Sequence, residues 1–260
     1  MQHTFTAMTY NIWGDWDLEA RSESLAELMR RRQPDLLGVQ ELHPDSTAVI
    51  DRALPGHDRV HGEEPGWKTR SNLWWNRDLF DLQEHGATDV GILHEDSLLF
   101  WAKLRSTVAP TAPVLTLASA HLTFPGHPVE RETDRSPRTE QATAVGEALL
   151  ELNVDGATLL CIDINDYARP LWALYDRGFR EPFGILGRTS PITHPVTPRR
   201  DRPAPWEDVQ TVEKAIDWIF HTGPVHPRNA EVIDFFHEGI APSDHKPVMA
   251  TFTMSDEASS

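Results

Sequence analysis

The sequence predicts an α+β fold in which two packed, mostly antiparallel β-sheets carry helices on their outer faces. Three observations support this fold class. The chain begins with alternating strand and helix patterns, continues with several strands that have no helix between them, and ends with a helix followed by further strands. Strands that follow one another without helices favour antiparallel pairing through hairpins. A chain of 260 residues, 39% of them apolar, is long enough to bury a large core.

The predicted strands are short runs of apolar, β-branched and aromatic residues bounded by turn-forming residues. They cover residues 5–12, 35–41, 58–61, 73–75, 79–85, 97–104, 114–121, 157–162, 215–221, 230–236 and 247–252. The predicted helices repeat apolar residues at helical spacing or follow a proline that suits a helix start. They cover residues 18–32, a segment that begins after Pro44, and residues 137–152 and 171–176. Residues 184–206, rich in Pro and Arg without periodicity, predict a long loop.

Domain organisation and location follow from features that the sequence lacks. Nothing marks a domain boundary, so residues 1–254 are expected to form one domain and the small, polar residues 255–260 a flexible tail. The single cysteine, Cys161, excludes an intrachain disulfide. No basic amino-terminal region precedes an apolar run, and no span of about 20 apolar residues occurs. We therefore expect a cytoplasmic protein with no transmembrane segment.

The charge of the chain limits its partners. Its 40 acidic and 24 basic residues give a formal net charge of −16. Such a charge repels a polyanion at long range, so tight non-specific binding to duplex DNA is not expected. Most of the basic residues are arginines, whose guanidinium groups form bidentate contacts with phosphate. A small phosphorylated ligand, or a single strand bound where arginines gather in one groove, is compatible with this composition.

Polar side chains that suit metal binding and proton transfer stand at or beside the ends of predicted strands. They are Asn11, Glu41, His121, Asp163, Asn165, Asp217, Asp244 and His245. Strand ends that point the same way meet at one edge of a sheet sandwich, so these residues are expected to share a pocket. Carboxylates are ligands for Mg²⁺, and imidazole gains or loses a proton near neutral pH. The neighbouring Asp244 and His245 could therefore serve both halves of a phosphoryl-transfer site.

Six short motifs around these residues follow one another in a set order. They are Thr9-Tyr10-Asn11-Ile12, Gln40-Glu41, His121-Leu122, Asp163-Ile164-Asn165, Ile216-Asp217-Trp218-Ile219 and Ser243-Asp244-His245. In this order they resemble the motif set of the endonuclease/exonuclease/phosphatase superfamily, over residues 9–248. The resemblance implies the four-layered αββα sandwich of deoxyribonuclease I. One position departs from the family pattern, since Ile162 stands where the family usually has glycine before the Asp of its Asp-x-Asn motif.

The resemblance implies a metal site and its ligands. Glu41 corresponds to the principal ligand of Mg²⁺ or Mn²⁺, which suits a cation that keeps most of its waters. Asn11 corresponds to a residue that holds the metal or its water shell. Asp244 corresponds to a carboxylate that binds the metal directly or through another group, and the choice between these two roles stays open.

The resemblance also implies the groups that act on the phosphate. Asp163 corresponds to the carboxylate that orients or deprotonates the attacking water, and Asn165 and His121 correspond to donors toward the phosphoryl or leaving oxygens. His245 corresponds to a residue that hydrogen-bonds the scissile phosphate or transfers a proton. Asp217 corresponds to the carboxylate that holds the ring tautomer of this histidine.

The residues that contact the rest of the substrate are less well defined by the sequence. Arg131 and Arg138 follow His121 and offer guanidinium groups for a phosphate or a sugar, or they pair with the acidic residues around them. Trp13 is a candidate for stacking on a base or covering a sugar, with core packing as the alternative. Four arginines of the long loop carry the same two interpretations as Arg131: Arg188, Arg199, Arg200 and Arg202.

Together these features predict a divalent-metal-dependent phosphoesterase in which an activated water attacks a phosphodiester or phosphomonoester in line. Two substrate classes stay open, a phosphorylated small molecule or headgroup and a single-stranded nucleic acid. The alternative is a catalytically inactive binding or scaffold protein with the same fold. Because all six motifs retain residues that are competent for catalysis, we favour the enzyme.

Overall fold

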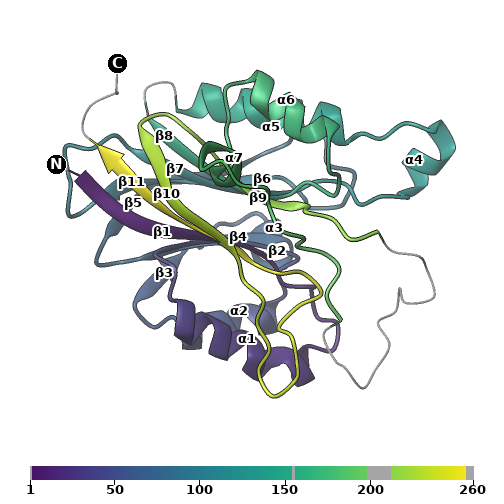
Figure 1. The fold of residues 1–260 in the computed structure, drawn as a ribbon, viewed down its shortest axis with the longest axis horizontal. Coiled ribbons are helices and arrows are strands. Elements are labelled where there is room, and N and C mark those ends of the chain that lie inside the picture. Colours follow the sequence, from purple (N-terminus) through teal and green to yellow (C-terminus); the bar gives the residue numbers. More distant parts are fainter. Residues whose placement is uncertain (1, 154–155, 198–211, 256–260) are drawn as a thin grey trace.

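Two β-sheets lie face to face between two layers of helices in the computed structural model, which describes residues 2–153, 156–197 and 212–255 (Figure 1). The six-stranded sheet has the order β10 (Val225–Val232), β11 (Val248–Ser255), β1 (Gln2–Asn11), β2 (Leu36–Gln40), β4 (Ser71–Asn76) and β3 (His57–Arg59). The five-stranded sheet has the order β5 (Phe80–Thr88), β6 (Leu99–Ser106), β7 (Leu115–His121), β8 (Ala157–Asp163) and β9 (Asp217–Thr222). The predicted α+β sandwich of four layers is confirmed.

Helices cover the outer face of each sheet. α1 (Leu18–Arg32) and α2 (Pro44–Ala53) lie on the six-stranded sheet, and α5 (Arg138–Leu152) and α6 (Arg169–Asp176) lie on the five-stranded sheet (Figure 1). Three helices of four to six residues occur elsewhere: α3 (Gly66–Thr69), α4 (Pro128–Thr133) and α7 (Pro182–Ile185). Figure 1 shows α4 on an arm that projects from the sandwich. Among the described residues, no helix has both the length and the apolar run needed to cross a membrane.

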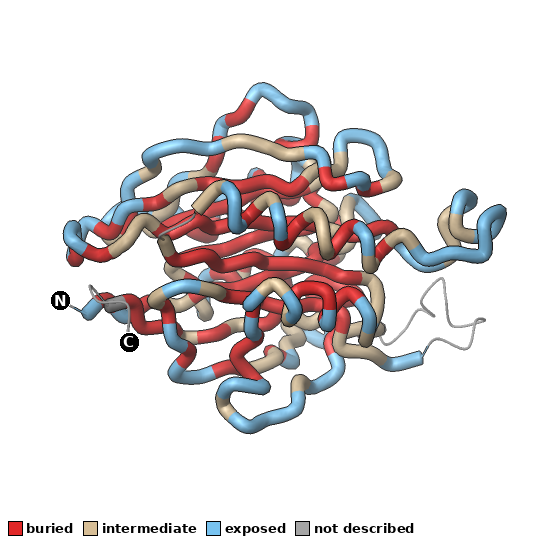
Figure 2. Tube along the Cα trace, turned by 90° about the horizontal axis from the view of Figure 1, so that it is seen from above, coloured by how far each residue is buried: buried red, intermediate tan, exposed pale blue. Residues whose placement is uncertain are grey.

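The apolar core has three parts, which follow the four layers. The central part lies between the sheets and includes Phe5, Phe100 and Phe252, each at most 1% exposed. A second part lies between α5, α6 and the five-stranded sheet, and a third between α1, α2 and the six-stranded sheet. Figure 2 shows the buried strands inside a shell of exposed helix faces and loops. Close packing on both faces makes the strands a rigid support for side chains at their ends.

Helix α1 begins and ends at the predicted residues. Leu25, Leu28 and Met29 recur at helical spacing and are fully buried against the sheet. Basic residues occupy the last turn, where they favour the negative end of the helix dipole. Gln33 then adopts a left-handed conformation with φ of 40°, and Pro34 prevents a further helical turn. The apolar periodicity and the residues typical of a helix end agree here, so the sequence alone is sufficient to predict the bounds of α1.

One parallel strand pair in each sheet brings the predicted site residues to the same edge. β1 pairs with β2, and β7 with β8, in parallel, whereas the other described strand neighbours are antiparallel. The register places His121 beside Asp163, and Asp163 beside Asp217. Asn11 ends β1 and Glu41 follows β2, at the end of the sandwich opposite the termini (Figure 1). Ligands of α/β sheets bind at such carboxyl ends of parallel strands.

The predicted strand at residues 230–236 was wrong in position, since β10 covers residues 225–232. Ile233 and Phe235 belong to the core beside α1 and α2, so their apolar character reflects packing against helices and not membership of the strand. Pro227 lies inside β10 at a register shift between Pro227 and Asn229. A proline is tolerated in a strand at such an irregularity, but it weakens the strand pattern in the sequence.

The predicted long loop at residues 184–206 is partly structured. Its first two residues end α7, and His194 forms a β-bridge with Lys214. Arg188 donates to Ala230 O at 3.3 Å and so lies against β10. The remaining arginines of that loop, Arg199, Arg200 and Arg202, lie outside the described residues, as do residues 256–260 of the predicted tail.

His221 on β9 is a buried histidine whose protonation is expected to destabilise the fold. Burial lowers its pKa from 6.5 to about 4, and the nearby His226 and Arg180 act in the same direction. The folded state holds the neutral ring, whereas the unfolded chain can take up a proton on it. The unfolding free energy is therefore unaffected by His221 above pH 6.5, and it falls as the pH drops from 6.5 toward 4. Between pH 7.5 and 5, the wild type should therefore lose about 2 kcal/mol more unfolding free energy than His221→Gln.

Urea unfolding at the two pH values measures this difference. His61→Gln is the matched control for loss of one histidine, because His61 is exposed. Equal pH dependence in the wild type and in His221→Gln would show that another group is responsible.

Candidate active site

Asn11 joins the ends of the two sheets. Its side-chain Nδ2 donates to Glu41 Oε1 and to Asp163 Oδ2, both at 2.9 Å. Its amide oxygen accepts the backbone N–H of Trp13 at 3.0 Å. Asn11 therefore presents its nitrogen, and not its oxygen, to the two carboxylates. In this arrangement the amide aligns Glu41 and Asp163, and it does not offer an oxygen ligand to a cation between them.

His121 and Asn165 lie on another side of the Asp163 carboxylate. His121 Nε2 is 3.5 Å from Asp163 Oδ2 and 3.9 Å from Glu41 Oε1. Asn165 Nδ2 lies 2.8 Å from His121 Nε2 and donates to Leu122 O at 3.0 Å, while the Asn165 N–H donates to Asp163 Oδ1 at 2.9 Å. These bonds fix the imidazole ring at the edge of the site.

The backbone is strained at three positions that follow the ends of strands. Trp13, Glu41 and Asn165 have φ values of 61°, 53° and 50°, in the left-handed region. A residue other than glycine adopts this region at a cost of about 1–3 kcal/mol. The strained residues lie just after β1, β2 and β8, where the chain turns and the site side chains project. Left-handed residues also occur elsewhere, such as Gln33 after α1, but these three follow the strand ends that carry the site residues.

His245 and Asp217 form a buried pair. His245 Nδ1 is 2.9 Å from Asp217 Oδ2 and 3.1 Å from Oδ1, and the two residues are at most 6% exposed. Burial by itself lowers the pKa of His245, but the carboxylates of Asp217 and then Asp244 outweigh burial and raise this pKa well above its usual value. Asp217 therefore keeps a proton on Nδ1 and turns Nε2 toward Asp163, whose Oδ2 is 3.9 Å away.

Asp163 is negatively charged at the centre of the site. Burial by itself raises the pKa of Asp163. The positive charges of the nearby His121 and His245 rings and the hydrogen bond from Asn11 outweigh burial, so that the pKa of Asp163 is lowered. At Asp217 burial prevails over the bond to His245, and the pKa is raised. Asp163 is therefore anionic at neutral pH and able to orient a water molecule.

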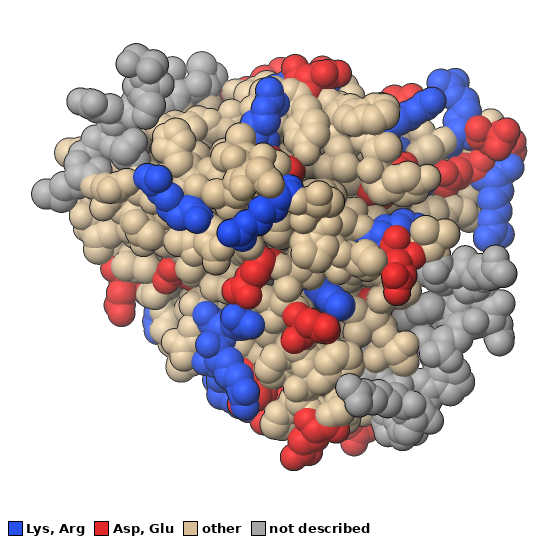
Figure 3. Space-filling view, in the orientation of Figure 1, with Lys and Arg blue, Asp and Glu red and all other residues tan. Residues whose placement is uncertain are grey.

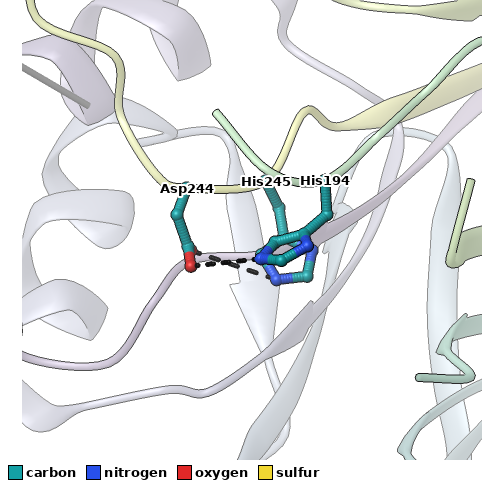
Figure 4. A group of neighbouring side chains, drawn as sticks. All are labelled: His194, Asp244 and His245. Atoms are coloured by element: carbon teal, nitrogen blue, oxygen red, sulfur yellow. Dashed lines mark ion pairs between the residues drawn. The ribbon is translucent and has the colours of Figure 1, made fainter. Parts of the chain in front are cut away.

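Asp244 faces a histidine that the sequence did not distinguish. His194 Nε2 lies 3.7 Å from Asp244 Oδ2, and the His194 ring centroid is 4.5 Å from that of His245 (Figure 4). Asp244 Oδ1 is in turn 4.0 Å from His245 Nε2. His194 comes from the segment that the sequence predicts as a long loop, where no periodicity or motif marks it. Only its spatial neighbours show its relation to the site.

A buried arginine connects two segments that carry site residues. Arg21 of α1 is fully buried and donates to Ile12 O at 3.1 Å, to Trp16 O at 2.8 Å and to Pro242 O. Next to Pro242, Ser243 Oγ donates to the backbone carbonyl of Asn11 at 2.8 Å. Leu18, Leu25, Leu28 and Met29 recur at helical spacing, which predicts the arginines of this helix on the opposite, solvent-facing side, and this prediction is wrong for Arg21. Arg21 can be buried because backbone carbonyl groups accept hydrogen bonds from its guanidinium group.

The two predicted substrate arginines differ in environment. The Arg138 side chain is 6% exposed and pairs with Glu130 at 2.6 Å and with Asp166 at 3.4 Å. It also donates to Thr123 O at 3.0 Å, so it fixes the loop that follows His121. Arg131 is exposed on α4, on the projecting arm (Figure 1). The guanidinium group of Arg138 is thus engaged by carboxylates of the protein itself.

Arg138→Gln is expected to lower the free energy of unfolding by about 2 kcal/mol, because it leaves the partly buried Glu130 without its cation. The Arg138 guanidinium also holds the pKa of Glu130 below its usual value. Thermal unfolding measures the effect, and Arg131→Gln on the exposed arm is the control that should unfold like the wild type. An unchanged midpoint together with a raised KM in Arg138→Gln would instead support the predicted contact with substrate.

Trp13, the predicted stacking residue, packs on its neighbour Trp16. The two rings are nearly parallel, with centroids 6.4 Å apart and an interplanar angle of 17°. The Arg21 guanidinium lies 5.0 Å from the Trp13 ring centroid on the protein side. Trp16 is 62% exposed. Trp13 therefore supports the exposed ring of Trp16, which also follows Asn11 in the sequence and shares the stacking prediction made for Trp13.

A pocket of about 380 Å³ opens beside Glu41 and His121. It lies between the loops that follow β1, β2 and β7, with α3 and the segment before β6 completing the wall. Aromatic and aliphatic side chains form much of the lining: Trp16, Ile92, Leu98, Phe100 and Phe124. Arg70 is the one Lys or Arg among the described residues that line it. A pocket of this kind suits the ring of a small ligand next to the carboxylate cluster.

The donor atoms at this edge fit a hard divalent cation. The Glu41 side chain is 33% exposed and borders both the pocket and the Asn11 amide that it shares with Asp163. Carboxylate oxygens are the ligands that Mg²⁺ and Mn²⁺ prefer. Among the described residues, Asp163, Asp217 and His245 also have ligand atoms within 4.8 Å of one another. The residues present therefore fit the metal that the sequence implied.

A four-layered sandwich with carboxylates, amides and histidines at one edge belongs to the class of metal-dependent phosphoesterases. A family model described as "Endonuclease/Exonuclease/phosphatase family" matches residues 8–245. The chain belongs to this family, and the predicted resemblance is confirmed. A search of curated proteins finds no match.

Solved structures of low sequence identity share the fold. A family protein from Bacteroides thetaiotaomicron aligns with a TM-score of 0.79 and 18% identity, over 100% of this chain and 99% of that chain. TDP2 from D. rerio in complex with a single-strand DNA product has a TM-score of 0.76 and 17% identity, over 96% and 98%. The mannosyl-6-phosphatase of Bacteroides thetaiotaomicron has a TM-score of 0.75 and 19% identity, over 95% and 99%. These likenesses are evidence for the fold alone.

Proposed function

We propose that this protein hydrolyses a phosphate ester with the help of Mg²⁺ or Mn²⁺. The observation that carries the proposal is that polar contacts of 2.8 to 4.0 Å link all the predicted catalytic and metal residues at one edge of the sandwich. These residues are Asn11, Glu41, His121, Asp163, Asn165, Asp217, Asp244 and His245. Such a cluster offers both metal ligands and donors for phosphoryl oxygens.

Glu41 is the proposed metal ligand, because it is the partly exposed carboxylate that borders the pocket. When bound, the cation supplies positive charge that stabilises the phosphoryl oxygens in the transition state. Asn11 keeps the Glu41 and Asp163 carboxylates aligned through its two donated bonds. The family resemblance implies that Asn11 holds the metal or its water shell, and alignment of the Glu41 carboxylate is compatible with the second of these roles.

Asp163 orients the attacking water in the proposed mechanism. Its lowered pKa makes it a weak base, which favours orientation of the water over removal of its proton. His245 carries a raised pKa and directs Nε2 into the site, so it donates to a phosphoryl oxygen as negative charge develops there. Asp217 holds the opposite ring nitrogen. His121 at the end of β7 and Asn165 just after β8 lie beside the same Asp163 carboxylate.

A phosphorylated small molecule is the substrate class that we propose. The pocket beside Glu41 and His121 has room for a single sugar or nucleoside group. On the face shown in Figure 3, basic and acidic side chains of the described residues are interspersed. With a net charge of −16 as well, this surface provides little attraction for a long polyanion.

A substrate panel with the metal varied tests the proposal. The compounds are a nucleotide, a sugar phosphate, an inositol phosphate, sphingomyelin and a single-stranded oligonucleotide, each with Mg²⁺, with Mn²⁺ and with a chelator. We expect hydrolysis of one small compound that stops when the metal is removed. Faster cleavage of the oligonucleotide than of every small compound would overturn the substrate class. No metal-dependent hydrolysis of any compound, including a nitrophenyl phosphodiester, would favour a binding or scaffold protein.

A further inference from the structure

His194 is held between two neighbouring segments by backbone hydrogen bonds. The Lys246 N–H donates to Thr193 O at 2.7 Å, which joins the His194 segment to the one that carries Asp244. On the other side, the His194 N–H donates to Lys214 O at 3.0 Å, and the Lys214 N–H donates to His194 O at 2.8 Å. The backbone at His194 is therefore held by pairing on both sides, as in a sheet.

Asp244 faces two imidazole rings at distances that suit a shared cation. Its Oδ2 is 3.7 Å from His194 Nε2, and its Oδ1 is 4.0 Å from His245 Nε2 (Figure 4). Both separations are too long for a hydrogen bond between these groups. A tetrahedral cation with bonds of about 2.0–2.2 Å keeps its ligand atoms about 3.3–3.6 Å apart. The three ligand atoms, one from each residue, lie within 4.8 Å of one another. Movements of up to about 1 Å by each side chain therefore bring all three onto one cation.

Asp217 prepares His245 for such a contact. Its carboxylate holds the Nδ1 of His245 at 2.9 Å, which leaves Nε2 as the nitrogen that faces Asp244. A histidine that binds a metal through one nitrogen commonly donates its other ring N–H to a carboxylate. The three ligand atoms lie within 4.8 Å of one another, and Asp244 and His245 are at most 6% exposed. The arrangement thus has the supporting contact that metal sites require.

We propose that His194, Asp244 and His245 form a second cation site, separate from Glu41, that takes a borderline-soft divalent cation such as Zn²⁺. Two imidazoles and a carboxylate suit transition metals, whereas Mg²⁺ prefers oxygen ligands. Binding releases the Nε2 proton of His245 to solvent and occupies that nitrogen. Zn²⁺ therefore inhibits hydrolysis. Metal binding at this site does not depend on the proposed function. The predicted inhibition rests on the proposed function.

Zn²⁺ added alone to the metal-free, full-length protein tests the site. Competition with a chromophoric chelator gives the Zn²⁺ affinity of the wild type, of His194→Gln and of His226→Gln. His226 is exposed on β10 and provides the matched control for loss of one histidine. We expect His194→Gln to bind Zn²⁺ at least about tenfold more weakly than His226→Gln. Equal affinities of the two variants would overturn the proposal.

A measurement on the unmodified chain covers the case in which His194→Gln fails to fold. Anomalous diffraction at the zinc absorption edge, from crystals soaked in Zn²⁺, should give a peak between the His194, Asp244 and His245 side chains. A peak at Glu41 alone, or no peak between the three side chains, would overturn the proposal.

Inhibition separates this proposal from the proposed function. Hydrolysis is followed with Mg²⁺ and a nitrophenyl phosphodiester, each variant being compared with its own rate without Zn²⁺. The Zn²⁺ concentration for half inhibition should be at least about tenfold higher in His194→Gln than in His226→Gln. Weakened binding with unchanged inhibition would overturn the inhibitory role of the site. Absence of hydrolysis in every variant would count against the proposed function, while the binding data still decide on the site.

Discussion

Glu41→Gln is expected to lower kcat/KM for the best substrate by at least about 10³-fold, which corresponds to about 4 kcal/mol of lost transition-state stabilisation. The amide keeps the shape of the carboxylate but removes the negative charge that is proposed to hold the cation beside Asp163. Because the Glu41 side chain is 33% exposed, its replacement leaves the buried core unchanged. Steady-state kinetics, with the concentration of Mg²⁺ varied, measure the loss.

Glu63→Gln is the matched control for this variant, since Glu63 is an exposed glutamate outside the cluster. It should retain the rate and the metal dependence of the wild type. Unchanged unfolding temperatures in both variants would establish that the fold is intact. If Glu41→Gln keeps more than a tenth of the wild-type rate, Glu41 is not the principal metal ligand.

His245→Ala is expected to lower kcat by about 10²–10⁴-fold, because it removes the imidazole that is proposed to donate to the phosphoryl oxygen. Asp217→Asn should cost less, since it leaves the ring in place and removes only the carboxylate that orients and charges it. In the double variant, Asp217→Asn should add little to the loss caused by His245→Ala. Steady-state kinetics of the two single variants and the double variant measure this coupling.

Additive losses in the double variant would show that Asp217 does not act through His245. His85→Ala, at an exposed histidine on β5, is the control for removal of an imidazole and should retain activity. A wild-type kcat in folded His245→Ala would remove this histidine from the proposed mechanism.

Local sequence patterns were sufficient for most helices and strands, and they failed where packing changed the meaning of a pattern. The boundaries of α1 match the prediction because its buried face, its last basic turn and Pro34 all point to the same segment. In contrast, Ile233 and Phe235 looked like strand residues but pack in the core beside α1 and α2. An apolar run indicates that a segment is buried, but it does not indicate whether that segment is itself a strand or packs against helices.

The sequence by itself determined the fold class, the family and the set of polar residues at the strand ends, because these depend on periodicity and on short motifs. Only the tertiary structure decided how those residues meet. Asn11 and Asp163 are 152 positions apart, and their contact depends on the packing of one sheet against the other. Contacts between loops enclose Arg21 among backbone carbonyl groups and bring His194 to Asp244. Contacts of this kind leave no local pattern, since they arise from strand register and loop pairing across the whole domain.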